Sequence, residues 1–282
     1  MGRHSNLRTT GVLVALVLAL FGCVACGGPS PDARPAEPAA QTETHAEEAR
    51  PEESAQSSGA DVGNQAAIDP VSFAATDVVS ATDIERAGGV DAFFRVNEIS
   101  DAVFARMDGN SYKPDCTVPV GDLRYVRTLY VDAGGVTHVG ELVVNAAVAE
   151  EVRDIFRELY DNKFPIRLMR LVDDYGGSDE ASCSDGNTSA FNFRNVPGTN
   201  VISNHSFGLA IDVNTFENPY CIPEQSYLWP PEASAYLDRS LDDPYMIHPG
   251  DVCYEAFVSR GWQWGGEWPT PQDYQHFEKP GA

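Results

Sequence analysis

Hydrophobic residues recur at helical spacing in two parts of the chain. Residues 90–107 carry the first pattern, which predicts an amphipathic helix over that range. A second helix is expected over about residues 146–161, with Asn145 as its N-cap. Its predicted apolar stripe consists of Val148, Val152, Ile155, Phe156 and Leu159.

Short segments between and after these helices read as strands. The clearest alternation of apolar and polar residues covers 136–144, and further strands are expected over 165–172, 209–213 and 274–278. Residues 175–188 are rich in Gly, Asp and Ser and are expected to form a loop. Helices and strands do not alternate regularly, so the pattern predicts an α+β fold rather than a doubly wound sheet.

The first 26 residues have the pattern of an export signal. Basic residues precede an apolar run, 11–21, that is short for a membrane-spanning helix. A small residue before Cys23 at the end of this run resembles a bacterial lipobox. This predicts lipidation of Cys23, with Cys26 as the alternative acceptor. An ordinary cleaved secretory signal is the other interpretation. We expect an exported protein, lipid-anchored at the bacterial cell surface or otherwise secreted.

The export signal is followed by a segment that lacks large apolar side chains. Residues 27–61 contain no Val, Ile, Leu, Met, Phe, Tyr or Trp and are rich in Pro, Ala, Glu and Ser. Such a composition buries too little apolar surface to offset the entropy of ordering the chain. We therefore predict a signal over 1–26, a disordered acidic tether over 27–74 and one folded domain over 75–282.

Charge and cysteine content narrow the class of protein further. The formal net charge is −23, which argues against nucleic acid as a partner because phosphate binding requires Lys and Arg. Four cysteines lie beyond the signal, and in an exported chain they predict two disulfides. The expected pairs are Cys221–Cys253, which would close a Pro-rich excursion, and Cys116–Cys183.

Two separate runs carry residues suited to a metal site. His205 and Asp212 lie seven residues apart, and Gly208 between them permits the turn that would bring them together. His276, near the C-terminus, supplies a third ligand. Two imidazoles and one carboxylate leave a fourth tetrahedral position open, which is typical of a catalytic zinc ion. The sequence therefore predicts one Zn²⁺ at these three residues.

A hydrolytic zinc site also needs a general base, and Asp273 is the nearest candidate. Strict strand alternation would place Asp273 and His276 on opposite faces, so Asp273 is expected in a turn that leads into the strand. Two prolines just before it favour such a turn. Glu267 and Glu278 remain alternative bases, although Glu267 reads as a solvated carboxylate and Glu278 as a partner of a ligand.

The pattern S-x-H-x-x-G-x-A-x-D, followed by D-x-x-H, resembles the VanY-type D-alanyl-D-alanine carboxypeptidases, which are LAS-type zinc peptidases. The resemblance covers about residues 93–282 and includes the runs 140–145 and 187–194 and the segment Gly-Trp-x-Trp-Gly-Gly. It implies a LAS-type domain, in which helices pack on a small antiparallel sheet.

The resemblance also implies roles for individual residues. It makes the two histidines and Asp212 the zinc ligands and Asp273 the general base. Arg194 matches an arginine that contacts the scissile carbonyl or its oxyanion, and Ser203 matches a serine near the substrate. A guanidinium suits the first role because it supplies fixed donors without losing its proton.

The activity implied by the resemblance is zinc-dependent hydrolysis of peptidoglycan stem peptides at the terminal D-alanyl-D-alanine bond. An alternative is the same chemistry on an L-alanyl-D-glutamate or other endopeptidase bond. A second alternative is a catalytically silent, zinc-containing domain that binds the cell wall. We expect contact with a membrane only through the lipid anchor, and the sequence does not indicate an oligomeric state.

Overall fold

The computed structural model describes residues 66–281 of the chain. The export signal, the lipidation of Cys23 or Cys26 and the tether up to residue 65 lie outside the described residues and stay predictions. Within the described part, no helix has the length and apolar character needed to cross a membrane.

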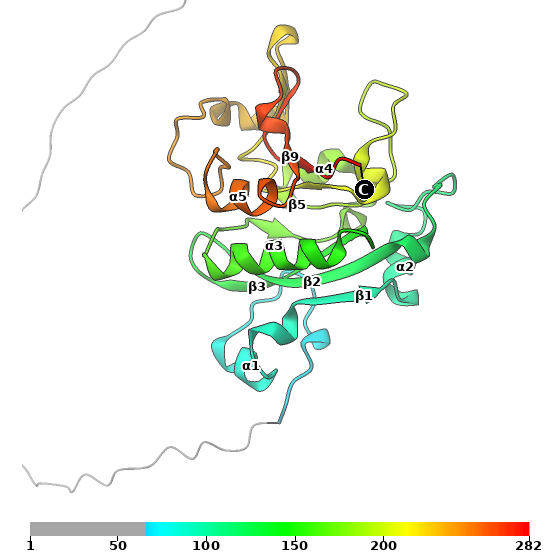
Figure 1. Cartoon of the computed structure of the whole chain (residues 1–282), viewed down its shortest axis with the longest axis vertical. Helices are drawn as coiled ribbons and strands as arrows, with labels where there is room; N and C mark the ends of the chain where they lie inside the picture. Colours follow the sequence, from blue (N-terminus) through cyan, green and yellow to red (C-terminus); the bar gives the residue numbers. More distant parts are fainter. Residues whose placement is uncertain (1–65, 282) are drawn as a thin grey trace, which may run out of the picture. The chain divides into compact units, whose positions relative to one another are not determined.

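A three-stranded antiparallel sheet lies at the centre of the domain (Figure 1). Its strands are β1 (Arg95–Glu98), β2 (Leu123–Val131) and β3 (Thr137–Asn145), in that order. In the β2–β3 hairpin, Leu123 lies opposite Asn145 and Val131 lies opposite Thr137. The strand expected over 136–144 is therefore confirmed, displaced by one residue.

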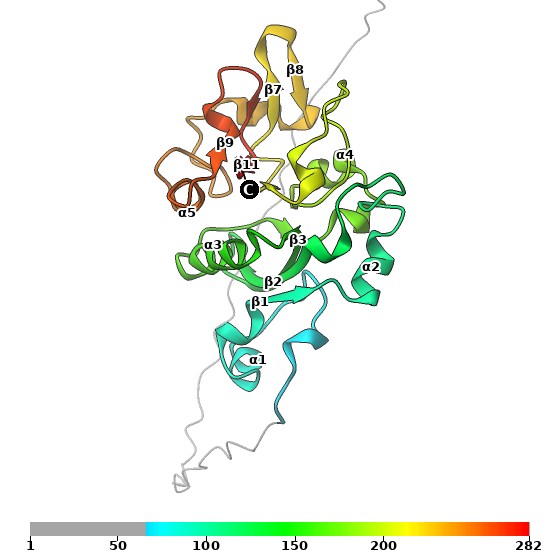
Figure 2. The same ribbon diagram turned by 45° about the vertical axis from the view of Figure 1, so that its right-hand side comes forward.

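Helix α3 (Ala149–Asp161) packs against this sheet, and α5 (Val252–Val258) packs against α3 on the other side (Figures 1 and 2). The predicted apolar stripe of α3 is buried in the main core. The helix begins later than expected, and Asn145 does not cap it. Instead, the Asn145 side chain accepts a hydrogen bond from the backbone of Ala147 (3.0 Å) and donates one to the carbonyl of Phe207 (3.0 Å).

The single helix expected over 90–107 is wrong. This segment forms a 3-10 turn (Val90–Phe93), then β1, then α2 (Asp101–Met107). Ser100 starts α2 as its N-cap, because its hydroxyl accepts a hydrogen bond from the backbone of Val103 (3.3 Å). The preceding backbone pairs with the open edge of β2, and this pairing overrides the helical spacing of the apolar residues.

The segment expected to be a loop over 175–188 also contains regular structure. It includes α4 (Asp179–Ser184) and β5 (Asn187–Thr188), and β5 pairs in parallel with β4 (Leu168–Met169). The longer strand expected over 165–172 is thus reduced to β4. The polar composition of this segment suggested a loop, but polar residues also begin helices. Here Ser178 caps α4, because its hydroxyl accepts from the backbone of Ala181 (3.2 Å).

Two further antiparallel sheets, each of three strands, carry the C-terminal half. The first has the order β6-β11-β9 and the second β10-β7-β8. Their bounds are β6 (Ala210–Asp212), β7 (Tyr220–Ile222), β8 (Tyr227–Trp229), β9 (Gln263–Trp264), β10 (Gln272–Asp273) and β11 (His276–Glu278). The strands expected over 209–213 and 274–278 are present in shortened form as β6 and β11. Helices and small, mostly antiparallel sheets together make an α+β fold, as expected.

Short helical elements complete the described chain. Besides α1 (Ala81–Arg86), the remaining 3-10 helices are Pro70–Ser72, Val120–Asp122, Val172–Tyr175, Asn204–Phe207, Pro223–Gln225, Pro231–Leu237 and Gly265–Glu267.

Residues 66–74 pack on the domain, although the sequence assigns them to the tether. The ring of Phe73 lies 5.8 Å from that of Phe93. The guanidinium of Arg127 donates to the carbonyl of Phe73 (2.6 Å). The expected boundary at residues 74/75 is therefore too late, because this mostly apolar segment makes both ring contacts and backbone hydrogen bonds to the domain.

Neither expected disulfide is present, since all four cysteines of the described residues are free thiols. Cys253 lies fully buried in the main core with α5, whereas Cys221 lies on β7 beside Gln272. Cys183 is buried in α4, while Cys116 packs against a smaller apolar cluster. The members of each predicted pair thus belong to different packing environments.

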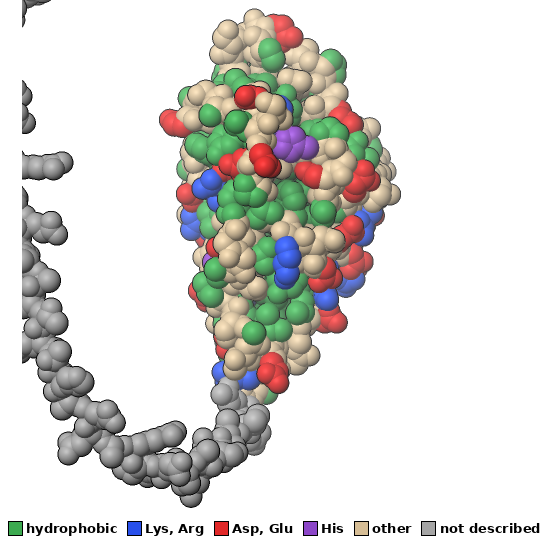
Figure 3. Space-filling view, turned by 90° about the vertical axis from the view of Figure 1, so that its left-hand side faces the viewer, with side chains coloured by type: hydrophobic (Ala, Val, Ile, Leu, Met, Phe, Trp, Pro, Cys, Tyr) green, Lys and Arg blue, Asp and Glu red, His purple; other side chains and the backbone are tan. Residues whose placement is uncertain are grey.

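Charged side chains are interspersed with hydrophobic ones on the face shown in Figure 3. Several arginines on and near α3 are paired with carboxylates. Arg153 contacts Asp154 (2.7 Å) and Arg260 contacts Glu158 (2.8 Å). These pairs lie on the surface, where each contributes at most about 1 kcal/mol to stability.

Candidate metal centre and active site

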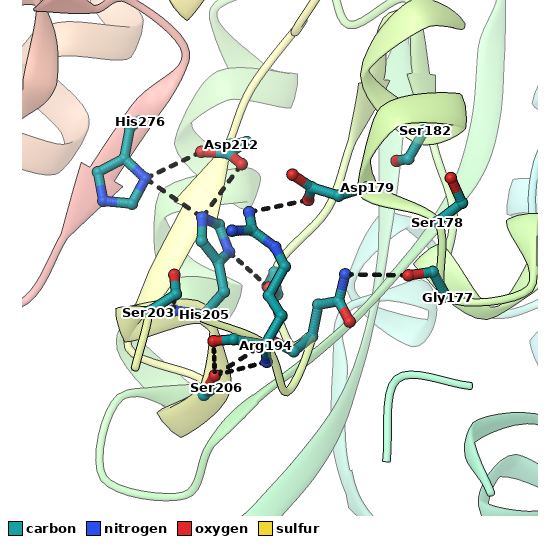
Figure 4. Close-up of polar contacts among 12 residues, drawn as sticks. Gly177, Ser178, Asp179, Ser182, Arg194, Ser203, His205, Ser206, Asp212 and His276 are labelled. Atoms are coloured by element: carbon teal, nitrogen blue, oxygen red, sulfur yellow. Dashed lines mark hydrogen bonds and ion pairs between the residues drawn. The ribbon is translucent and has the colours of Figure 1, made fainter. Parts of the chain in front are cut away.

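The three predicted metal ligands meet in space. His205 lies in the 3-10 helix Asn204–Phe207, Asp212 ends β6, and His276 begins β11 directly opposite Asp212. The two carboxylate oxygens of Asp212 lie 3.1 Å from His205 Nε2 and 3.0 Å from His276 Nδ1. The two imidazole nitrogens are 3.2 Å apart (Figure 4).

These distances fit a small divalent cation. Ligand atoms about 2.0–2.1 Å from a tetrahedral zinc ion stand about 3.4 Å from one another. The observed separations are slightly shorter, and all three side chains are at least nine-tenths buried. A carboxylate and two imidazole nitrogens that converge in this way match the nitrogen and oxygen ligands that zinc prefers.

Each imidazole is oriented by a partner on its far side. His205 Nδ1 lies 2.6 Å from the carbonyl oxygen of Ala190, which can only accept, so Nδ1 carries a hydrogen and the neutral ring offers the lone pair of Nε2 to a cation. His276 Nε2 lies 3.3 Å from a carboxylate oxygen of Glu278, which also accepts from Asn204 (2.6 Å). Such outer partners fix the tautomer of a metal-bound histidine.

The charges of this cluster depend strongly on one another. Burial alone would raise the pKa of Asp212, but the imidazoles of His205 and His276 hold this pKa well below its usual range. Burial would lower the pKa of His276, yet hydrogen bonds with Asp212 and Glu278 raise it to about 10. The Asp212 carboxylate is therefore stable only beside positive charge, supplied by a protonated imidazole or by a cation.

The turn that carries His205 is fastened to the central sheet. Ser203 caps the 3-10 helix, since its hydroxyl accepts from the backbone of His205 (3.3 Å). Gly208 ends it in the left-handed conformation, with φ of 67°. Asn145 then donates from its backbone to Gly208 (2.9 Å) and from its side chain to Phe207. Ser203, expected near the substrate, lines the cavity and also positions a ligand.

Strand alternation places the other two ligands. Ile211 and Val213 are fully buried in the core, and Asp212 between them points to the opposite side of the strand. On β11, Phe277 packs in the core while His276 faces the cavity. One alternating pattern thus builds both the core and the metal-ligand group.

Asp273 lines the same cavity, but its place in the secondary structure differs from the expected one. It ends β10, which belongs to the other sheet, and a turn at 274–275 separates it from His276. Asp273 therefore lies on a strand just before the turn, and the expectation that it lies in the turn is wrong. Gly265 permits its close approach, because a Cβ there would lie 2.6 Å from the carbonyl oxygen of Asp273.

The Asp273 carboxylate is suited to exchange a proton. Its Oδ1 is buried and has no hydrogen-bond partner among the described residues. Burial raises its pKa to about 6. The two alternative bases both have hydrogen-bond partners. Glu267 accepts from the Tyr254 hydroxyl (2.7 Å), and one oxygen of Glu278 contacts both His276 and Asn204. The structure therefore favours Asp273 over both.

Arg194 also faces the cavity, with its side chain 17 % exposed. Its Nη2 donates to the carboxylate of Asp179 (2.8 Å), and its backbone N–H donates to Ser206 (2.9 Å; Figure 4). Burial would lower the pKa of the guanidinium, but Asp179 and then Asp212 raise it. Sequence reasoning missed Asp179; the helix-start signal at Ser178, followed by acidic residues, could have revealed it.

A cavity of about 320 Å³ connects these groups. Its lining includes an aromatic group and an aliphatic group. The aromatic group consists of Tyr220, Tyr227, Trp229 and Trp268, and the aliphatic group of Val196, Pro197, Val201 and Ile202. Sequence reasoning missed the aliphatic group, since its residues carry no motif of their own.

Residues 197–279 match a family model described as D-alanyl-D-alanine carboxypeptidase. The matched segment contains His205, Asp212, Asp273 and His276, whereas Arg194 precedes it. The match confirms the resemblance to VanY-type carboxypeptidases over this part of the chain. The chain has no match among curated proteins and none among solved structures.

Proposed function

We propose that the chain is a zinc-dependent peptidase that hydrolyses peptidoglycan stem peptides on a LAS-type domain, with the terminal D-alanyl-D-alanine bond as its target. The observation that carries the proposal is the convergence of His205, Asp212 and His276 with the buried Asp273 carboxylate, whose Oδ1 has no hydrogen-bond partner, in one cavity. The family match over residues 197–279 supports the class of substrate.

The two histidines and Asp212 would hold the ion, and their outer partners would keep both imidazoles oriented for binding. A zinc ion at this position supplies Lewis acidity, which polarises a carbonyl group and lowers the pKa of a water molecule. The buried position of the ligands makes that charge effective, since little solvent competes with it.

Asp273 would act as the general base. A carboxyl group with a pKa near 6 is mostly ionised at neutral pH and still regains a proton readily. Its buried oxygen can accept a proton from the attacking water and then deliver it to the nitrogen of the departing amino acid. The same residue thereby serves both halves of the hydrolysis.

Arg194 would stabilise the negative charge that develops on the carbonyl oxygen. The guanidinium remains positively charged throughout, and Asp179 occupies only one of its terminal nitrogens. Donors fixed in place before the reaction stabilise such charge at little reorganisation cost. A domain that only binds zinc and cell wall would not need this arginine or the buried Asp273 carboxylate.

We also propose that the protein works outside the cell, anchored through Cys23 or Cys26. This proposal rests on the N-terminal sequence pattern alone. A lipid-anchored domain on a polar tether could reach the stem peptides of the wall, so location and substrate are mutually consistent.

The test is incubation of the purified protein with a defined pentapeptide stem, followed by mass spectrometry of the products and zinc analysis. Release of one alanine from the C-terminus, with about one zinc per chain, is the expected result. Cleavage between L-alanine and D-glutamate would instead establish the endopeptidase alternative. A protein that binds zinc and cell wall but cleaves no peptide would instead establish the alternative of a catalytically silent wall-binding domain.

Two variants test the assignment of the base. Asp273→Asn should lower kcat by about 10²- to 10⁴-fold, the usual contribution of a general base. The matched control is Glu267→Gln, since Glu267 contacts Tyr254 and not the metal ligands, and its activity should stay close to wild type. If Glu267→Gln is the more damaging change, Asp273 is not the base.

A further inference from the structure

Asp179 lies outside the segment matched by the family model, yet it contacts the arginine of the site. We propose that Asp179 is a positioning residue that holds the Arg194 guanidinium in its working orientation and affects the reaction only through Arg194. The proposal rests on the proposed function, because it assigns Arg194 a role in stabilising the oxyanion.

The contact between the two side chains is short and sheltered. Asp179 Oδ1 lies 2.8 Å from Arg194 Nη2, and the two side chains are 28 % and 17 % exposed. Nη1 makes no hydrogen bond within the described residues, which leaves it available to a substrate oxygen. A charge-assisted bond of this kind restricts a long, flexible side chain more strongly than a neutral one.

Asp179 is itself held by a well-anchored helix. It is the first residue of α4, directly after the Ser178 cap. Ser182 of α4 is fully buried and accepts a hydrogen bond from Asn187 (3.0 Å). Thr215 donates from its hydroxyl to the carbonyl of Cys183 (3.0 Å), which ties the helix to the chain beyond β6. A site residue supported by such packing keeps its geometry more precisely than one on a free loop.

The arginine needs such a partner because other carboxylates attract it. Asp212 interacts electrostatically with the Arg194 guanidinium, and Asp273 lines the same cavity. Without Asp179, the guanidinium could turn toward either of them and leave the position where the oxyanion forms. A displacement of the guanidinium by about 1 Å is enough to lower the rate of hydrolysis by about 100-fold.

A double-mutant cycle tests the proposal on defined stem peptides. Asp179→Ala should lower kcat by about 10- to 100-fold with KM changed by less than about threefold. In an Arg194→Ala background, the same substitution should change kcat by less than about twofold, because its effect passes through the missing arginine. Asp179→Asn should recover part of the lost kcat, since the amide oxygen can still accept from Nη2 but lacks the charge of the carboxylate.

The matched control is Asp185→Asn at the other end of α4. Asp185 also pairs with an arginine, Arg170 (2.9 Å), but it does not line the cavity. Its substitution should leave kcat within about twofold of wild type. An equal loss from Asp179→Ala with and without Arg194, or a loss that Asp179→Asn does not recover, would overturn the proposal.

A second readout separates this proposal from the proposed function. The Nε–H signal of Arg194 in nitrogen-15 NMR, assigned by its absence in Arg194→Ala, should shift or broaden in Asp179→Ala and stay unchanged in Asp185→Asn. A wild-type protein that cleaves no stem peptide would refute the proposed function, while this spectrum would still decide whether Asp179 holds the arginine. An unaltered signal in Asp179→Ala would refute the positioning role.

Discussion

Substitution of Gly208 by alanine should be far more damaging than an ordinary glycine-to-alanine change. Gly208 ends the turn that carries His205, and it adopts a φ of 67° that L-residues disfavour. An added Cβ would also lie 2.5 Å from the backbone nitrogen of Asn145 and 2.9 Å from the carbonyl carbon of Val144. Both neighbours are backbone atoms of β3, so neither can rotate away.

The expected cost has two parts, and the chain offers a control for one of them. A residue other than glycine in the left-handed region costs about 1–2 kcal/mol. Forcing an atom into a filled space costs about a further 1–3 kcal/mol. Gly198 has a similar φ of 73°, but a Cβ there would meet nothing within 4 Å. Gly198→Ala should therefore lose about 1–2 kcal/mol of unfolding free energy, and Gly208→Ala about 2–5 kcal/mol.

Urea unfolding, followed by tryptophan fluorescence, measures both losses on the metal-free protein. The difference between the two variants isolates the clash with β3 from the backbone penalty. Competition with a chelator should in addition show weaker zinc binding in Gly208→Ala, because the displaced turn moves His205. Equal losses of stability in the two variants would refute the claim that this turn packs directly on β3.

Three further predictions concern stability and the metal. Arg106→Met should lower the free energy of unfolding by about 3 kcal/mol, because it leaves the buried Glu141 carboxylate without its paired guanidinium. Asp174 contacts the exposed side of the same arginine, so Asp174→Asn should lower this free energy by under about 1 kcal/mol. Urea unfolding measures both values. Burial raises the pKa of Asp273 to about 6, so its contribution to stability is present below about pH 4 and is lost as pH rises through about 6. Relative to Asp273→Asn, the metal-free wild type should therefore lose stability between pH 4 and pH 7, and a difference that does not change with pH would contradict this. Removal of zinc by a chelator should abolish activity and lower Tm, and added zinc should restore both.

The sequence predicted the parts of the site that depend on local patterns. The convergence of His205, Asp212 and His276 could be predicted because each lies in a compact motif. Helix α3 was predictable for the same reason, since its apolar stripe faces a single core.

The features that sequence reasoning missed depend on contacts between distant segments. The backbone of β1 pairs with an edge of β2 that no local pattern reveals, so residues 90–107 looked like one helix. Asp273 is positioned by its pairing with β7, and Asp179 by a short helix in a stretch with the composition of a loop. The two disulfides were wrongly predicted because the spacing of cysteines along the chain does not show which thiols lie close together in the fold.

The two-residue connection between Asp273 and His276 joins two independent frameworks. Asp273 is held by the sheet that bears Tyr220, Tyr227 and Trp229, whereas His276 is held by the sheet that bears Asp212. The distance between the Asp273 carboxylate and the His276 imidazole is therefore set by the length of this connection. We expect the connection to tolerate changes of residue type far more readily than an insertion or deletion, which would change the position of the proposed base relative to the proposed metal ligands.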